Sequence, residues 1–175
     1  TSPTLKLRQK KDKMTKKLNL SVNDLVVRYG KVLKVFEVDK DTVSLQPFFE
    51  KQSGNGLTFT INLSNVNDGS IRKLDPKPKI KQLQKDIIKK SLTKEDCPAF
   101  DSKTALSLNQ LEDTLWTVKA LYIEKQEKAG VLLGGKLSTF KNAIQQASQE
   151  FAAINNTMPE KEHDKILLDL ASSLK

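Results

Sequence analysis

The chain has 175 residues, 37% of them hydrophobic and 29% charged, which is typical of a folded protein with one domain or two small ones. Its single cysteine excludes an internal disulfide framework, and its single histidine leaves no Cys/His set for a zinc site, so we expect neither a metal nor a cofactor. No apolar run approaches the roughly 20 residues of a membrane span, and no secretory signal is recognisable. We therefore expect a cytoplasmic protein that does not associate with membranes.

The net charge of +9 is concentrated in two segments. Residues 1–17 contribute +6 and residues 76–100 contribute +4, whereas residues 18–75 are neutral and residues 101–175 carry −1. A strongly basic chain is attracted to polyanions. Residues 1–17 lack apolar periodicity, which predicts a flexible basic arm, and a solubilising tail explains such an arm as well as a binding role does.

Residues 18–76 have the pattern of a small all-β unit. Short apolar runs are separated by the turn sequences "DKD" and "SGNG", and β-branched and aromatic residues fill the runs. Pro47 lies inside one run and cannot donate to a ladder, so its strand is expected at a sheet edge or at a bulge. Five short strands in fewer than sixty residues predict a Tudor- or SH3-like β-barrel.

The last of these runs, "LTFTINLS" at residues 57–64, alternates strictly between apolar and polar side chains. A period of two predicts a strand with one buried face and one exposed face. The exposed face carries Thr58, Thr60 and Asn62, which form hydrogen bonds without carrying charge. Such a face suits solvent and a protein partner equally well.

"DPKPK" at residues 75–79 separates this unit from a helical part, residues 77–175, because prolines restrict the backbone and donate no hydrogen bond. Ile80, Leu83 and Ile87 are spaced as the apolar stripe of a first helix. Three lysines repeat every four residues on another face of it, and form a basic ridge: Lys81, Lys85 and Lys89.

Three further helices are predicted. A capping box of Ser107 and Gln110 begins the second, which ends at "KAG"; an apolar stripe marks the third at residues 137–151; and Thr157 begins the fourth. The predicted fold class is therefore α+β in two parts, a small N-terminal Tudor/SH3-like β-barrel (residues 18–76) followed by a four-helix C-terminal bundle (residues 77–175).

The motifs that carry enzyme chemistry are missing. "GVLLGGKLS" at residues 130–138 resembles a phosphate-binding loop, but Leu137 stands where such a loop needs Ser or Thr, so we interpret it as a turn between helices. His163 lies in a charged helical start and is interpreted as a surface residue. The acidic neighbours of Cys97 oppose thiolate formation. We therefore expect a protein that is not an enzyme.

The order of parts resembles the CarD/CdnL family of bacterial RNA polymerase-binding transcription regulators. "LSVNDLVVRYGKVLKV" is similar to that family's first strand pair, and "FTINLSNVNDGSIRKL" to its strand, Asn-containing loop and terminal arginine, with Asn65, Ile71 and Arg72 in corresponding places. "VKALYIEKQEKAG" followed by "GGKLSTFKNA" is similar to its pairing of helices. The resemblance covers residues 18–174.

The resemblance implies a monomeric regulator that stabilises the open promoter complex. Its barrel would bind the RNA polymerase β subunit through Thr58, Thr60 and Asn62, although the family usually has a basic residue and a proline at the last two positions. Its helical part would contact promoter DNA without reading sequence. The family's DNA wedge is a tryptophan, and the only aromatic residue in that interval here is Phe100, for which a loop anchor is an equal interpretation. The candidate DNA contacts are Lys81, Lys85, Lys89, Lys90, Phe100 and Lys103.

A second function class explains the charge and the small barrel equally well. A general RNA- or ribosome-associated binding module would have the same basic segments, and would bind RNA in the absence of polymerase. The sequence leaves this alternative open.

Overall fold

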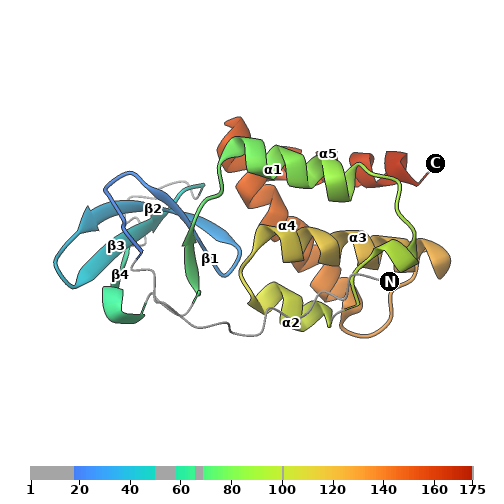
Figure 1. Ribbon diagram of the computed structural model, residues 1–175, viewed down its shortest axis with the longest axis horizontal. Coiled ribbons are helices and arrows are strands. Elements are labelled where there is room, and N and C mark those ends of the chain that lie inside the picture. The colour runs from blue at the N-terminus through green and yellow to red at the C-terminus, as the bar shows by residue number, and fades with distance from the viewer. Residues whose placement is uncertain (1–17, 50–57, 66–68, 100, 175) are drawn as a thin grey trace.

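The structure is a computed structural model that describes residues 18–49, 58–65, 69–99 and 101–174. The described chain is mixed α+β, with an antiparallel five-stranded sheet curled into a half-barrel at one end and five α-helices at the other (Figure 1). The sheet comes from the N-terminal part and the helices from the C-terminal part, which confirms the predicted order. The predicted arm, residues 1–17, lies outside the described residues.

Neighbouring strands pair antiparallel in the spatial order β4-β3-β2-β1-β5, so β5, the last strand in the chain, pairs with β1, the first. At the β1–β2 turn Tyr29 and Gly30 both have positive φ, 48° and 75°, as a two-residue hairpin requires. The strands are β1 (Leu25–Arg28), β2 (Lys31–Val38), β3 (Thr42–Pro47), β4 (Phe59–Asn62) and β5 (Ile71–Lys73).

The prediction for Pro47 is corrected in one respect. Its strand, β3, is not at an edge, because β4 and β2 flank it. Pro47 is the last residue of β3, where the ladder ends and its missing N–H costs little. The bulge of this strand pair lies instead on β2, where the register shifts between Val35 and Glu37.

The described helices number five, one more than predicted. The additional helix is α2, whose N-cap Asp101 accepts a hydrogen bond from the Thr104 N–H at 3.2 Å. The predicted capping box is wrong, because the Ser107 hydroxyl donates to the Thr104 carbonyl inside α2 and Gln110 caps nothing with its side chain. The helices are α1 (Lys77–Leu83), α2 (Ser102–Ser107), α3 (Leu111–Glu127), α4 (Lys136–Asn155) and α5 (Pro159–Ser173).

One apolar core is shared by α1, α3, α4 and α5, with Phe140, Ile144 and Phe151 of α4 at its centre. A π-helical turn, Gln84–Ile88, continues α1. The wider turn places two neighbouring residues, Ile87 and Ile88, in this core together, whereas the α-helical spacing predicted only Ile87.

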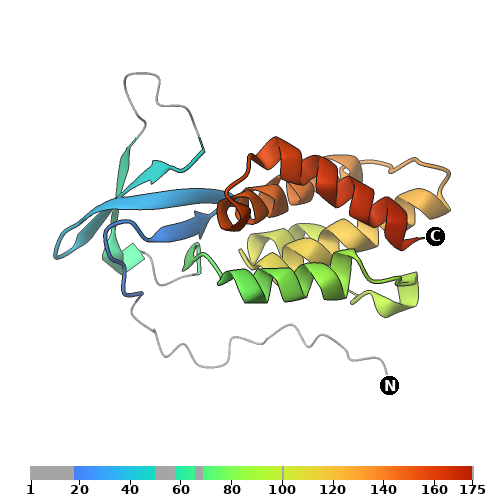
Figure 2. The same cartoon turned by 90° about the horizontal axis from the view of Figure 1, so that it is seen from above.

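The half-barrel and the helices are in direct contact. Alternate residues of β1 and β2 face two ways: Val26 and Leu33 lie in the core of the sheet, while Val27 and Val32 lie on the opposite face against Ala153 of α4. Figure 2 shows the end of α4 against these two strands. The β1–β2 hairpin is therefore buried on both faces at Val26–Val27 and Val32–Leu33.

A buried polar cluster reinforces this contact. One guanidinium nitrogen of Arg72, on β5, lies 2.8 Å from each carboxylate oxygen of Glu150 on α4. The side-chain amide of Asn109 donates to the carbonyls of Val27, Gly69 and Ser70. The backbone carbonyl of Asn109 accepts a hydrogen bond from the Arg72 guanidinium. Both Glu150 and Asn109 are buried. Burial raises the pKa of Glu150, and the charge and hydrogen bonds of Arg72 oppose that rise. The cluster fixes the sheet on the helices.

Candidate functional site

The basic ridge is displayed by α1 and the π-helical turn. Pro76 precedes the helix and Pro78 lies in its first turn, where a missing N–H is tolerated. Ile80 and Ile87 are buried, whereas the lysines that lie between and after them are exposed. The three ridge lysines, Lys81, Lys85 and Lys89, are exposed. Lys90 is exposed as well, and we include it in the ridge as a fourth lysine.

The ridge lysines differ from their neighbour Lys79, whose ammonium lies 3.0 Å from a carboxylate oxygen of Asp75. Among the described residues, no carboxylate lies within ion-pair distance of the four ridge lysines. The charges of Lys81, Lys85 and Lys89 therefore face solvent, as a phosphate-binding surface requires, whereas the charge of Lys90 also acts on Asp96 and helps to lower the pKa of that carboxylate. The structure brings four of the six candidate DNA contacts together.

The other two candidates are not part of this ridge. Lys103 lies on α2, with its side chain 3.8 Å from the point where Gly135 would carry a Cβ. Figure 1 shows α2 along the opposite edge of the helical part from α1. Phe100 lies outside the described residues.

A buried lysine anchors the far end of the ridge. The Lys119 ammonium donates to the carbonyls of Ile88 and Lys90, at 3.1 and 2.9 Å, and to the Ser173 hydroxyl at 2.6 Å. It thereby binds carbonyl groups at the end of the π-helical turn, and burial lowers its pKa. Sequence reasoning missed this residue, although a charged side chain one turn after Leu115 on an apolar stripe was a usable signal.

The second candidate surface is β4, an edge of the sheet. Its burial alternates as predicted: Phe59 and Ile61 are half-buried, while Thr60 and Asn62 are exposed. Thr58, just before the strand, is exposed as well. The three predicted partner-binding side chains thus follow one another on one exposed face. The Thr60 hydroxyl lies 3.0 Å from the Ser44 hydroxyl on β3.

The hydrogen-bond register shows which backbone N–H groups of β4 point away from the sheet. The Leu63 N–H donates to the Asp41 carbonyl at 2.8 Å, and Asp41 and Leu63 continue the β3–β4 register. Because hydrogen-bonded residues alternate along an antiparallel ladder, the N–H groups of Thr60 and Asn62 point away from β3. The edge can accept another strand there.

The two residues considered for catalysis have ordinary surroundings. Burial raises the pKa of the Cys97 thiol, an effect that Lys119 opposes and Asp96 reinforces. His163 lies 3.7 Å from an Asp164 carboxylate oxygen in a half-exposed position. Within the described ranges, no three His, Cys, Asp or Glu side chains converge as metal ligands.

The stretch that resembled a phosphate loop connects α3 to α4, as interpreted. Lys136, its lysine, contacts Glu124 at 2.6 Å. In the described part of the chain, no helix is long and apolar enough to cross a membrane.

Comparison with known proteins adds no family: no protein-family model matches the chain, and no curated protein matches it either.

Proposed function

We propose that the protein is a bacterial transcription regulator that resembles the CarD/CdnL family. In this proposal the half-barrel is a Tudor-like unit whose β4 edge binds the RNA polymerase β subunit. The helices form a four-helix bundle, made of α1, α3, α4 and α5 with α2 as an addition, and the lysine ridge of α1 binds promoter DNA. The regulator then stabilises the open complex.

The observation that carries the proposal is the placement of two unlike surfaces on one rigid frame. The β4 edge is uncharged and offers outward N–H groups, which suits a protein strand. The ridge offers unpaired ammonium groups, which suit phosphates and read no sequence. The Arg72–Glu150 pair, between β5 and α4, holds the sheet and the helices in one relation. A protein that places polymerase and DNA relative to each other needs such a frame.

The polymerase contact is tested by co-purification with bacterial core RNA polymerase. Asn62→Pro removes an outward N–H, and Thr60→Glu adds charge to the exposed face, so both are expected to weaken binding at least tenfold. Ser172→Glu, an exposed change on α5, serves as the control and should bind normally. Full binding by both β4 variants would refute the dock at this edge.

The DNA contact is tested by the salt dependence of binding to duplex DNA of any sequence. Replacing Lys81, Lys85 and Lys89 by Gln should reduce the slope of log affinity against log salt by about 0.9 for each lost phosphate contact. The matched variant changes three exposed lysines elsewhere to Gln and removes the same charge: Lys40, Lys161 and Lys165. Equal slopes for the two triple variants would place the DNA site elsewhere. Tight RNA binding without polymerase binding would favour the RNA-associated module instead.

A further inference from the structure

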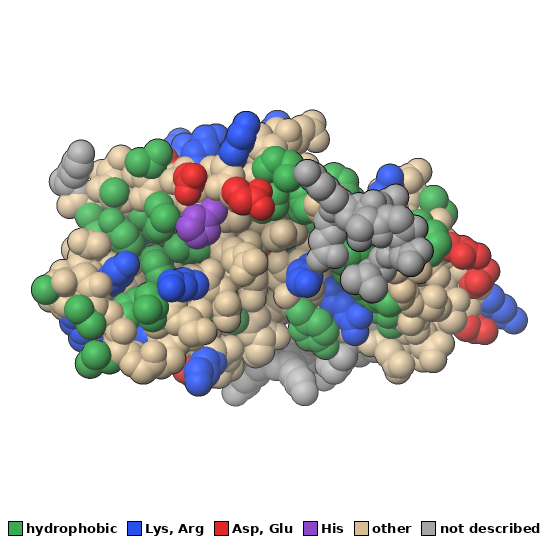
Figure 3. All heavy atoms as spheres, turned by 180° about the vertical axis from the view of Figure 1, so that it is seen from behind, with side chains coloured by type: hydrophobic (Ala, Val, Ile, Leu, Met, Phe, Trp, Pro, Cys, Tyr) green, Lys and Arg blue, Asp and Glu red, His purple; other side chains and the backbone are tan. Residues whose placement is uncertain are grey.

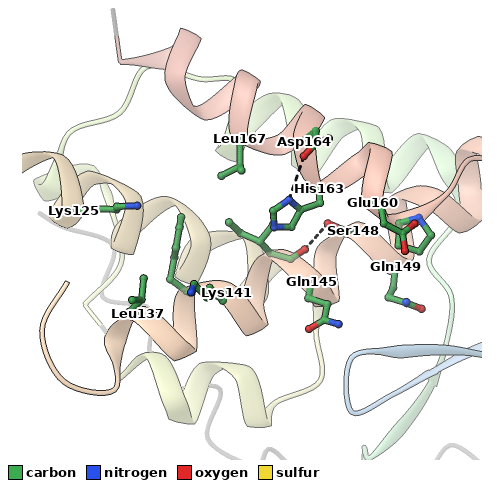
Figure 4. A pocket seen from close by; sticks show the side chains of 13 residues that line it. Lys125, Leu137, Lys141, Gln145, Ser148, Gln149, Glu160, His163, Asp164 and Leu167 are labelled. Carbon is green, nitrogen blue, oxygen red and sulfur yellow. Dashed lines mark hydrogen bonds and ion pairs between the residues drawn. The ribbon is translucent and has the colours of Figure 1, made fainter. Parts of the chain in front are cut away.

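A groove of about 570 Å³ lies between α4 and α5, away from both surfaces described above (Figure 4). Phe140 and Ile144, both buried, contribute to its lining, and Leu137 and Leu167 add partly exposed apolar side chains. Figure 3 views this face, where apolar side chains gather beside the single histidine, His163. The groove is predominantly apolar and open to solvent.

The groove has the length of a short helix. Its α4 wall runs from Leu137 to Gln149, which corresponds to about 18 Å at 1.5 Å per residue, or roughly three helical turns. Its α5 wall runs from Pro159 to Leu167. An elongated open groove between two helices suits an amphipathic helix, whereas small molecules prefer sites that enclose most of their surface.

Apolar side chains at the groove are exposed to solvent. Leu137 is 38% exposed, and Leu167, on the α5 wall, is half-buried. A partner that covered the groove would remove both side chains from water, and apolar burial of this kind is the main source of affinity in helix-in-groove complexes.

The charges around the groove are divided between its ends. Lys125 and Lys141 lie at one end and Glu160 at the other, with Asp164 on the α5 wall between them (Figure 4). The Lys125 ammonium lies 5.8 Å from the centre of the Phe140 ring. Among the described residues, neither Lys125 nor Lys141 has a carboxylate within ion-pair distance.

The neighbouring lysines are different. Lys128 and Lys136 both contact Glu124, at 2.9 and 2.6 Å, and these contacts lower the pKa of Glu124. The groove therefore keeps two uncompensated positive charges beside its apolar floor at one end and carboxylates toward the other. A helix is positive at its N-terminus and negative at its C-terminus, so this division of charge fits one helix direction.

We propose that the groove binds an amphipathic helix of a protein partner, about three turns long, with acidic side chains in its C-terminal turn. Its apolar stripe contacts Leu137, Phe140 and Leu167. Its C-terminal turn lies at Lys125 and Lys141, and its N-terminus lies near Glu160. The bound helix is thus antiparallel to α4. This site does not depend on the polymerase or DNA contacts.

A charge-swap experiment on the full chain tests the proposal. The probes are two 14-residue peptides with the same leucine stripe, one with glutamates and one with lysines in the last turn, measured by fluorescence anisotropy. The native protein is expected to bind the glutamate peptide about tenfold more tightly. The double variant Lys125→Glu, Lys141→Glu should reverse this preference. Circular dichroism should show that the double variant remains folded, so that the reversal reports on binding and not on misfolding.

Two further variants complete the experiment. Leu137→Ser should weaken both peptides, whereas Lys161→Glu, an exposed change on α5 outside the groove, should leave the preference unchanged. A spin label on the peptide C-terminus should broaden the amide signals of Leu137 more than those of Glu160. Broadening in the opposite order would contradict the predicted direction.

Several outcomes would overturn the proposal. One is equal affinity for the two peptides, and another is the absence of saturable binding up to about 1 mM. A dimer that Leu137→Ser dissociates, seen by sedimentation, would assign the groove to a second copy of the chain. Flotation with phosphatidylglycerol vesicles that is lost in the same variant would assign it to a lipid surface.

Discussion

At the scale of single residues, the Arg72–Glu150 pair decides how sheet and helices are joined. Removing Glu150 leaves the largely buried Arg72 guanidinium with the more distant Asp75, at 3.7 Å, as its ion partner, so Glu150→Gln is expected to lower the free energy of unfolding by about 3 kcal/mol. The double variant Arg72→Met, Glu150→Met should recover much of that loss, because it buries no charge. Urea unfolding measures both changes.

The Lys79–Asp75 pair, in which Lys79 is exposed and Asp75 also contacts Arg72, provides the reference for this prediction. Lys79→Ala should cost under about 1 kcal/mol, because the lysine is solvated and the two side chains gain little from contact. If Glu150→Gln costs no more than Lys79→Ala, the buried pair is not what joins the two parts.

Lys119 predicts a pH dependence whose sign follows from its burial. Burial lowers its pKa in the folded protein below the ordinary value of 10.5, so the folded state releases this proton first as pH rises. Between the two pKa values the unfolded state binds more protons, and the free energy of unfolding therefore rises with pH. We expect native protein to gain stability relative to Lys119→Met as the pH rises toward 10.5.

The Cys97 thiol must be removed from this comparison. Its pKa is raised above the ordinary value of 9.0, so its titration lowers the free energy of unfolding as pH rises, which is the opposite sign. Both proteins should carry Cys97→Ser. Parallel curves of stability against pH for the two would contradict a lowered pKa at Lys119.

At the scale of elements, the β1–β2 hairpin depends on a glycine for two reasons. Gly30 has φ of 75°, and an added Cβ would lie 2.1 Å from Cγ of Gln146 on α4. Gly130 has a similar φ of 85°, with nothing within 4 Å of its Cβ position. Both substitutions to alanine strain the backbone, but only Gly30→Ala forces a neighbour to move.

Comparing the stability costs of these two substitutions therefore tests the contact between the β1–β2 hairpin and α4. Gly30→Ala should cost about 1 kcal/mol more than Gly130→Ala in thermal or urea unfolding. In the background of Gln146→Ala, which removes the obstructing atoms, the two costs should become similar. Equal costs in the native background would mean that Gln146 moves aside freely.

At the scale of the whole molecule, sheet and helices are expected to unfold as one cooperative unit. Val27 and Val32 are buried against α4, and Asn109 donates to three carbonyls of the sheet part. An unfolding sheet would expose this surface of the helices as well. Hydrogen exchange should therefore give similar opening free energies for the amides of Val35 in β2 and Leu115 in α3.

Loss of the Asn109 contacts should divide this unit. Asn109→Ala removes the amide that donates to the carbonyls of Val27, Gly69 and Ser70, so the Val35 amide is expected to open at lower free energy than the Leu115 amide. If the two amides already differ by several kcal/mol in the native protein, the sheet folds independently of the helices.

The sequence by itself determined the features that depend on local periodicity. Alternation along residues 57–64 correctly predicted a half-buried and an exposed face for β4, and three- and four-residue spacing correctly predicted the stripes of α4 and α5 apart from Leu137, which is exposed. The lysines at 81, 85 and 89 were also placed correctly on an exposed side, because residues spaced four apart share a helix face and this face is not the one that carries Ile80, Leu83 and Ile87. Such patterns arise within a few residues of chain.

Only the tertiary structure decided which distant residues meet. The π-helical turn at Gln84–Ile88 exists because the core accepts Ile87 and Ile88 together and Lys119, 31 residues after Ile88, binds its terminal carbonyls. Arg72 and Glu150, 78 positions apart, pair because β5 and α4 converge. The packing of the helices also places Lys103 away from the ridge. Lys103 lies on α2, a short helix that begins at its N-cap Asp101 and runs along the edge of the helical part opposite α1 (Figure 1). Contacts between residues so far apart in the sequence depend on how the helices and strands pack, and the local spacing of apolar and polar residues does not predict that packing.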